Sequence, residues 1–318
     1  MSDSIVITAT ALALAEQPAP SVPAGGKTAS GAFSILRLPE EPADRRHTQL
    51  SSRLSRLIGE LASRAGLLPA DLAGPTTGLV SGSRYGCSLV ADMHRRLREL
   101  GPRGIDAVGF AQATHNFPVS ACAIDYGIQG PGIALVSSHA AGMEALTCGR
   151  DWLLEGRCDR VIVAAFEDLE GPAAAHVELL AAPGAPPVHE AMALVLLERG
   201  STARARRATV LAEIAGTAMM RPGAETGDLR AVAQRAFGHL PASMGILLAA
   251  PESASPPETA GGAPMLVDCL AVGGLLALIR ALDRPGPGDW LVGALDPRTG
   301  GIAAGLRCPP NACSEVAA

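Results

Sequence analysis

The sequence has few aromatic residues, a single lysine and no long apolar run. Phe, Trp and Tyr make up 3% of 318 residues, so a core has to be built from Ala, Val, Leu and Ile. Lys27 is the only lysine among 26 basic residues, and a formal net charge of −5 argues against a nucleic-acid-binding surface. No stretch of 18 apolar residues exists, which argues against a membrane-spanning helix. The start also lacks the basic region of a signal peptide, so we expect a cytoplasmic bacterial protein.

Metal-ligand and disulfide spacing is also missing. The seven cysteines are odd in number and never form a Cys-x-x-Cys pair. This argues against a disulfide framework and against a zinc site, and it favours small buried thiols in a reducing compartment. We therefore expect no structural metal.

What the sequence does contain is a regular alternation of apolar strands and amphipathic helices. Hydrophobic residues make up 48% and charged residues 18%, as in a packed globular protein. The pattern predicts strands at 4–9, 78–83, 133–137, 160–166, 191–197, 210–214, 245–249, 290–294 and 302–307. It predicts helices at 50–66, 89–100, 139–155, 229–237 and 270–282, and loops at 16–32 and 251–264. Such alternation favours layered α/β architecture over a sandwich or a bundle.

Three segments, in this order, resemble β-ketoacyl synthases. They are the first strand SIVITATALAL, the run GIQGPGIALVSSHAAGMEALTCGRDWLLEGRCDRVIVAAFEDL, and the downstream run HEAMALVLLERGSTARARRATVLAEIAG. The resemblance implies a thiolase-like layered α/β fold with two pseudo-symmetric halves. We expect a first half over residues 1–200 and a shortened second half over 201–318.

The residues that such enzymes use for condensation are altered. The family pattern Ala-Cys-x-x-Gly falls on residues 138–142, where His139 stands in place of the nucleophilic cysteine. The two family histidines are also missing, and no histidine occurs after His239. Because condensation needs a thiolate and those imidazoles, we expect no condensing activity from this chain alone.

Within the family, the run SHAAGMEAL resembles the chain-length factor of type II polyketide synthases, where glutamine usually replaces the cysteine. The resemblance implies a non-condensing subunit that pairs with an active ketosynthase. The pair would shape the tunnel for an acyl chain carried on the phosphopantetheine of an acyl carrier protein, in polyketide, polyene, aryl polyene or fatty-acid-like biosynthesis. No cofactor, nucleic acid or membrane is implied.

His139 leaves two interpretations open. It is a polar plug that fills the former nucleophile pocket, or it is an acid or base in a malonyl decarboxylase or acyltransferase. A third hypothesis is a homodimeric acyl-binding scaffold without a catalytic partner.

The resemblance also implies roles at the subunit interface. One group of residues would line the tunnel on a helix, one turn apart: Cys87, Val90 and His94. A second group would lie near the partner's pocket: His115, Asn116 and Phe117. The alternative for both groups is ordinary helix and loop packing.

Two acids and a basic cluster complete the candidates. Glu167 matches the acid that ends a family strand and Glu190 the acid of the family's GEG segment, and we expect both to be buried structural carboxylates. Arg204, Arg206 and Arg207 form a cluster that could meet an acidic carrier protein, although exposed arginines are common.

Overall fold

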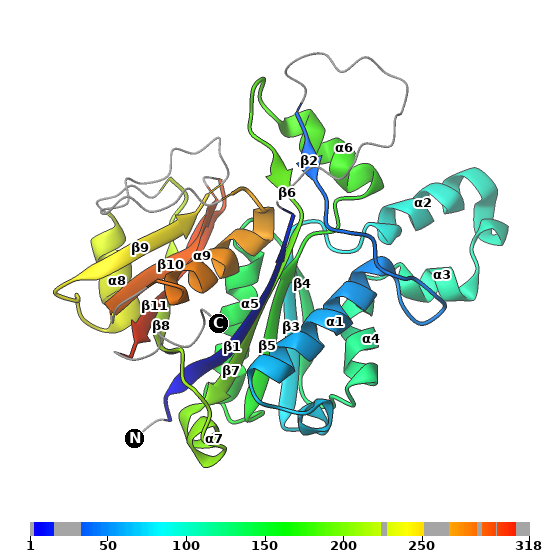
Figure 1. Cartoon of the computed structure of the whole chain (residues 1–318). Helices are drawn as coiled ribbons and strands as arrows, with labels where there is room; N and C mark the ends of the chain where they lie inside the picture. Colours follow the sequence, from blue (N-terminus) through cyan, green and yellow to red (C-terminus); the bar gives the residue numbers. More distant parts are fainter. Residues whose placement is uncertain are drawn as a thin grey trace.

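The computed structural model of the chain describes residues 3–15, 33–223, 228–250, 267–284, 288–296 and 298–309. Both loops predicted from composition, 16–32 and 251–264, lie outside these residues. Nine of the described strands form one mixed sheet in the order β4-β3-β5-β7-β1-β8-β11-β10-β9 (Figure 1). Their bounds are β1 Ile5–Leu14, β3 Thr77–Ser83, β4 Gly132–Val136, β5 Arg160–Phe166, β7 Ala191–Arg199, β8 Ala212–Met220, β9 Met244–Ala249, β10 Gly288–Asp296 and β11 Gly300–Cys308.

The sheet repeats one pattern twice. In the first half β4, β3 and β5 are parallel, and β7 and β1 then follow antiparallel. In the second half β9 and β10 are parallel, and β11 and β8 follow antiparallel. Among the described residues, the second half has no counterpart of the outer strand β4. The fold is therefore the expected layered α/β fold with a shortened second half, whereas the division after residue 200 stays a prediction.

Helices cover the sheet in layers. On the outer face of the first half lie α1 (Gln49–Arg64) and α4 (Phe117–Asp125), and α8 (Leu229–Phe237) covers the second half. Between the two halves lie α5 (Ala141–Leu154) and α9 (Gly273–Leu282), which contact each other (Figure 1). Residues of α5, α9 and strands of both halves form a single buried apolar cluster. The halves thus share a core.

The two half-sheets join over a short pairing. Only Ile5, Val6 and Ile7 of β1 pair with β8, so the half-sheets diverge beyond that point and leave room for α5 and α9. Gly142 lets α5 approach the second half closely, because a Cβ there would lie 2.5 Å from the carbonyl oxygen of Ala271. Glycine at this position is a packing requirement.

Most predicted elements are confirmed, with shifted ends. The helix predicted at 229–237 has those bounds, whereas the helix predicted from His139 begins at Ala141 and that from Leu270 opens as a 3₁₀ turn, η4 (Leu270–Val272). Strands β8 and β10 are longer than predicted, because ladder hydrogen bonds continue past their apolar residues into Gly, Thr and Asp.

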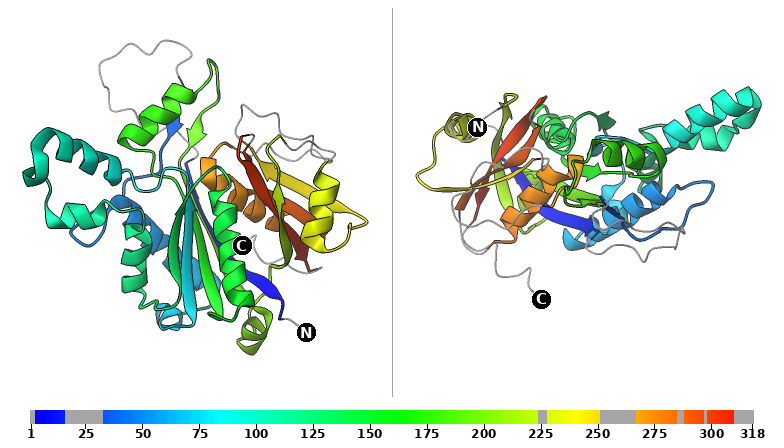
Figure 2. Two further views of the ribbon diagram at one scale, coloured as in Figure 1. Left: turned by 180° about the vertical axis from the view of Figure 1, so that it is seen from behind. Right: turned by 90° about the horizontal axis from the view of Figure 1, so that it is seen from above.

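A helical arm projects from the first half. It consists of α2 (Leu89–Leu100), η2 (Gly101–Gly104) and α3 (Ala107–Gln112), and it points away from the body in Figure 1 and in both views of Figure 2. None of the residues of α2 is buried. The remaining described elements are β2 (Ile35–Leu36), η1 (Pro69–Leu72), α6 (Gly171–Leu180), β6 (Val188–His189) and α7 (Gly200–Ala205). Of the helices in the described part, none is long and apolar enough to cross a bilayer.

Candidate functional site

Polar side chains from four segments meet at one edge of the sheet. Arg84 directly follows β3 and Glu167 directly follows β5, while His139 lies between β4 and α5. Because β3, β4 and β5 are parallel, these residues come out at the same edge. Asp296, the last residue of β10, reaches the same place from the second half. The cluster therefore joins both halves.

Glu167 is the buried anchor of this cluster. Its carboxylate accepts hydrogen bonds from the backbone N–H groups of Arg84 at 2.8 Å, Ala271 at 3.2 Å and Tyr85 at 3.3 Å. Burial raises the pKa of Glu167 to about 7, although the three N–H groups oppose the shift. The carboxyl ties the segment after β3 to η4 of the second half.

His139 is held by two charged partners. Its Nδ1 lies 3.1 Å from Oδ2 of Asp296, and Nη1 of Arg84 lies 2.8 Å from Nδ1 and 2.9 Å from Nε2. Nη1 of Arg84 is thus nearly equidistant from the two ring nitrogens. Asp296 also accepts the backbone N–H of Arg298 at 2.8 Å and of Thr299 at 3.2 Å. The imidazole is thus clamped from both sides.

These contacts fix the charge of the clamp. Burial and then the Arg84 charge lower the pKa of His139, and both outweigh the opposing effect of Asp296. Burial opposes ionisation of Asp296, but hydrogen bonds from Arg298, His139 and Thr299 outweigh it and lower the pKa of that carboxyl. The partners accordingly assign a neutral imidazole that donates its Nδ1 proton to an ionised Asp296.

The space beside His139 is very small. A cavity of about 10 Å³ adjoins the ring, which is room for about one water molecule. Its lining comes from the ends of β9 and β10, the segment 267–270 that leads into η4, and the first residue of α9: Ala249, Ala250, Val267, Asp268, Cys269, Leu270, Gly273 and Ala294. Among the described residues, the imidazole is thus occupied by Arg84 and Asp296, and the cavity beside it is small. In the described ranges no group of three or more His, Cys, Asp or Glu side chains could hold a metal ion.

The predicted tunnel residues do not share one helix. Cys87 precedes α2, since Gly86 has a φ of 69° and turns the chain before the helix starts at Leu89. The carbonyl of Cys87 nevertheless accepts the N–H of Val90 at 3.2 Å, so Cys87 lies one turn before Val90 although it is outside α2. A tunnel role for Cys87, Val90 and His94 stays a prediction. Val90 and His94 do lie one turn apart on α2, Val90 half-buried and His94 exposed.

The structure brings Cys87 together with His115. The backbone N–H of Cys87 donates to Nδ1 of His115 at 3.1 Å, and its thiol lies 3.6 Å from the carbonyl of Gln112. Burial raises the pKa of the Cys87 thiol to about 11. Cys87 therefore packs as a neutral thiol beneath the arm.

Asn116 and Phe117 lie where the arm returns to the body. Asn116 precedes α4 and is exposed, and its Nδ2 donates to Oγ of Ser120 at 3.3 Å. Phe117 opens α4 and is half-buried. Neither touches the His139 cluster through any described hydrogen bond, so a role for them at a partner's pocket stays a prediction.

Glu190 and the basic cluster have local partners. Glu190 is 4% exposed and accepts the backbone N–H of Leu38 at 2.9 Å and of Leu169 at 3.2 Å. Arg206 does not present its guanidinium to a carrier protein, because that group is bound to the fully buried Glu198. Burial of the pair therefore corrects the prediction for Arg206.

Sequence analysis missed Arg84 and Asp296. Arg84 follows the apolar strand TGLVSGS as an ordinary surface-type residue, and Asp296 begins a Pro/Gly turn 157 residues away from His139. An ionisable residue directly after each buried strand was the available signal, since ends of parallel strands meet at one edge. The pairing across the halves had no signal in the sequence.

Comparisons with known proteins agree with this architecture. Residues 44–182 match the model of the N-terminal domain of β-ketoacyl synthases. The chain is 29% identical over 183 residues to the polyketide synthase GfsB of Streptomyces halstedii; this covers 53% of the chain and 3% of that much longer protein.

Solved structures of low identity share the fold along nearly the whole chain. A type II polyketide ketosynthase in complex with its acyl carrier protein has a TM-score of 0.74 at 13% identity, covering 97% of this chain and all of that one. The ishigamide ketosynthase/chain length factor has a TM-score of 0.72 at 20% identity, covering 96% and 99%. A β-ketoacyl synthase from Burkholderia phymatum has a TM-score of 0.72 at 14% identity, covering 96% of this chain and 100% of that one. Residues 44–182 therefore resemble the N-terminal domain of β-ketoacyl synthases, and nearly the whole chain has the fold of these ketosynthase structures.

Proposed function

We propose that the chain is a non-condensing ketosynthase-like subunit that pairs with an active ketosynthase and forms one wall of an acyl tunnel, as a chain-length factor does. The observation that carries the proposal is the state of the former nucleophile position. His139 is clamped between Arg84 and Asp296, and the space beside it is about 10 Å³. An acyl thioester needs both a nucleophile and room for the chain, and the described residues at this position supply neither.

The exposed surface at the outer strand of the first half is consistent with binding of a partner subunit. Strand β4 is the edge of the sheet, and Ile133 and Val136 on it are 41% exposed. On the neighbouring arm Phe110 is 62% exposed. Apolar side chains beside an unpaired strand edge are a surface that another chain covers. We expect the contact through residues 87–94 and 110–127 to belong to the same surface.

The decarboxylase or acyltransferase alternative is less well supported by the geometry. A general acid or base has to reach its substrate, whereas the imidazole faces Asp296 on one side and a guanidinium on the other. The acyl-binding homodimer differs from the proposal only in its partner, so subunit composition separates these two.

The test is co-expression with a type II ketosynthase that has intact Cys and His motifs, using an acyl carrier protein as substrate carrier. We expect a one-to-one heterodimer by native mass spectrometry, with the acyl group on the ketosynthase alone. The isolated chain incubated with acyl carrier protein should gain no mass. A stable acyl adduct on this chain, or a chain that stays monomeric beside the ketosynthase, would refute the proposal.

A further inference from the structure

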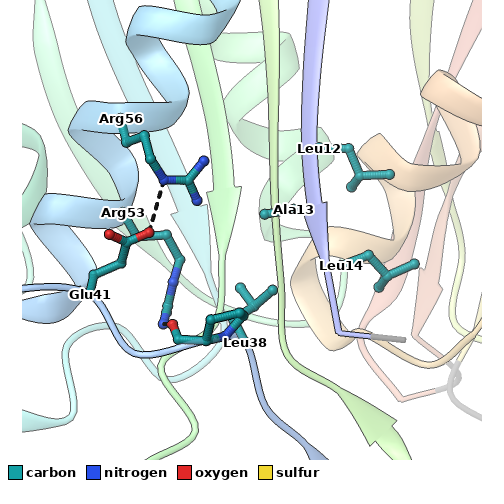
Figure 3. A pocket seen from close by; sticks show the side chains of 8 residues that line it. Leu12, Ala13, Leu14, Leu38, Glu41, Arg53 and Arg56 are labelled. Carbon is teal, nitrogen blue, oxygen red and sulfur yellow. Dashed lines mark hydrogen bonds and ion pairs between the residues drawn. The ribbon is translucent and has the colours of Figure 1, made fainter. Parts of the chain in front are cut away.

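A second cavity lies between α1 and the end of β1. Its volume is about 330 Å³, and it shares no lining residue with the cavity beside His139. Its walls come from β1, α1 and the segment after β2: Leu12, Ala13, Leu14, Leu38, Pro39, Glu41, Arg53 and Arg56 (Figure 3). The proposed function leaves it without a role.

Two arginines one turn apart on α1 line this cavity, and they differ in their partners. Arg56 is half-exposed and is bound to two carboxylates, Glu41 at 2.8 Å and Glu60. Arg53 is 6% exposed, and within the described ranges its one polar contact runs from Nη2 to the carbonyl of Pro39 at 2.6 Å. No described carboxylate lies within ion-pair distance of Arg53. Arg56, which is ion-paired, is therefore exposed, whereas Arg53, which has no carboxylate partner among the described residues, is buried.

A buried guanidinium without a counter-ion is energetically unfavourable. A guanidinium carries five N–H donors, and the Pro39 carbonyl satisfies one of them. Removing a charge from water costs several kcal/mol unless an opposite charge or further hydrogen bonds compensate. Arg53 lines the cavity and reaches from α1 toward Leu38, so its free donors are available to an occupant of that space (Figure 3).

We propose that this cavity binds a small monocarboxylate with a short apolar tail. The carboxylate would accept two parallel hydrogen bonds from Arg53, a geometry that suits the guanidinium fork. The tail would lie against Ala13, Leu38 and Pro39. The charged residues that line the cavity are Arg53, Arg56 and Glu41, so the lining has a net charge of +1, which matches a single carboxylate better than a doubly charged phosphate. A volume of about 330 Å³ is at the lower end for ligand sites and admits a tail of a few carbons.

Butyrate titrated into the full chain tests the proposal, with binding followed by ligand-observed NMR. We expect butyrate to bind in the millimolar range and its uncharged analogue butyramide not to bind. The Arg53→Gln variant should bind butyrate at least about tenfold more weakly, because a hydrogen bond to a charged group is lost. Arg64→Gln is the control on the same helix: Arg64 donates to the carbonyl of Thr10 and does not line the cavity, so binding should be unchanged.

A second variant decides the question if Arg53→Gln does not fold. Ala13→Leu places two branches of a side chain into the cavity and leaves the guanidinium in place, so it should abolish butyrate binding. Unchanged binding in either variant overturns the proposal. So does absence of binding to the unaltered chain, or inorganic phosphate displacing butyrate at lower concentration than butyrate itself binds. Since none of these variants touches the His139 cluster or β4, the outcome is separate from that of the subunit proposal.

Discussion

The two halves of the sheet have the same strand arrangement, but they differ in the strands and helices that are present in each. The first half has five strands, with β4 at its edge and the arm of α2 and α3 inserted between β3 and β4. The second half has four described strands, and β9 is its edge. The connection from β9 to α9 spans residues 250–272, against 84–140 for the corresponding connection from β3 to α5. The first half thus keeps the outer strand and the arm, and the described part of the second half is reduced.

The polar cluster at the junction is built from both halves. Arg84, His139 and Glu167 come from the first half, and Asp296 and the N–H of Ala271 come from the second. In a catalytic centre such groups would be turned toward a substrate. Here every one of them is turned toward another, so the site acts as a polar link between the halves.

The largest expected effect comes from truncating the shared core. Leu146 on α5 and Leu278 on α9 are both fully buried in the same cluster. Leu146→Ala and Leu278→Ala should each lower the free energy of unfolding by about 2–5 kcal/mol, because each leaves a cavity that the core cannot close. Chemical denaturation followed by circular dichroism measures the loss. If Leu278→Ala produced a separate first transition while the rest stayed folded, the halves would be independent units, contrary to the single core.

A proline at the open edge should separate the subunits. The backbone N–H of Leu79 donates to the carbonyl of Pro131, and that of Ser137 donates to the carbonyl of Ser83. In this parallel pairing the odd-numbered residues of β4 form the hydrogen bonds to β3, so the backbone N–H of Ala134 points away from β3, toward the open edge. Ala134→Pro therefore removes an edge N–H and keeps the β3 ladder. We expect the dissociation constant of the proposed heterodimer to rise at least about tenfold, measured by analytical ultracentrifugation. The circular dichroism spectrum of the variant should be unchanged. Ile133→Pro, which breaks the ladder to β3, is the matched control and should lower stability. An intact Ala134→Pro dimer would place the interface elsewhere.

The contributions of Glu167 and His139 to the free energy of unfolding should depend on pH in opposite directions. The pKa of Glu167 is raised to about 7 in the folded chain, so its contribution to stability is present below its unfolded pKa and is lost as pH rises through 7. The pKa of His139 is lowered, so its contribution is present above its unfolded pKa near 6.5 and is lost as pH falls below that value.

The unfolding free energy of the unaltered chain and of two variants, between about pH 5 and 8, separates these effects. Relative to Glu167→Gln, the unaltered chain should lose up to roughly 3 kcal/mol as pH rises. Relative to His139→Gln, it should lose stability as pH falls below about 6.5, by a smaller amount. A difference from Glu167→Gln that does not change with pH would mean that Glu167 is ionised throughout.

Local sequence pattern predicted the elements better than it predicted the site. Apolar runs such as 160–166 and the 229–237 helix are specified by their own residues, and the resemblance around 127–169 supplied the layered fold. The ends of β8 and β10 depend on hydrogen bonds to strands far away in the sequence, so the local apolar pattern predicted strands that were too short. His139 was found because it stands at a motif position. Arg84 and Asp296 were not, because what makes them matter is a contact across the halves.

A phenylalanine on the arm tests whether α2 faces the tunnel. Val90 is half-buried on α2, and Val90→Phe adds a ring into any space beside it. If that space is the tunnel, the heterodimer should release shorter products, measured by mass spectrometry of the extracted chains. Leu97→Phe, at an exposed position on the same helix, should leave product length unchanged. Equal product lengths for both variants would assign α2 to packing alone.

The smallest expected effect separates the plug from a hidden acid or base. In His139→Gln the side-chain amide has about the size of the imidazole, and its N–H₂ group donates to Asp296 as Nδ1 does now. The junction between the halves then stays intact, and the heterodimer should keep its condensing and decarboxylating rates within a few-fold. An imidazole that transferred a proton in the decarboxylation step could not be replaced by an amide, and the same change would slow that step roughly 10²–10⁴-fold. Malonyl carrier protein consumption by the purified heterodimer, timed by intact-mass analysis, distinguishes the two. Asp296→Ala serves as the control for the clamp, since it leaves His139 without its acceptor and should lower stability even if the rate is unchanged.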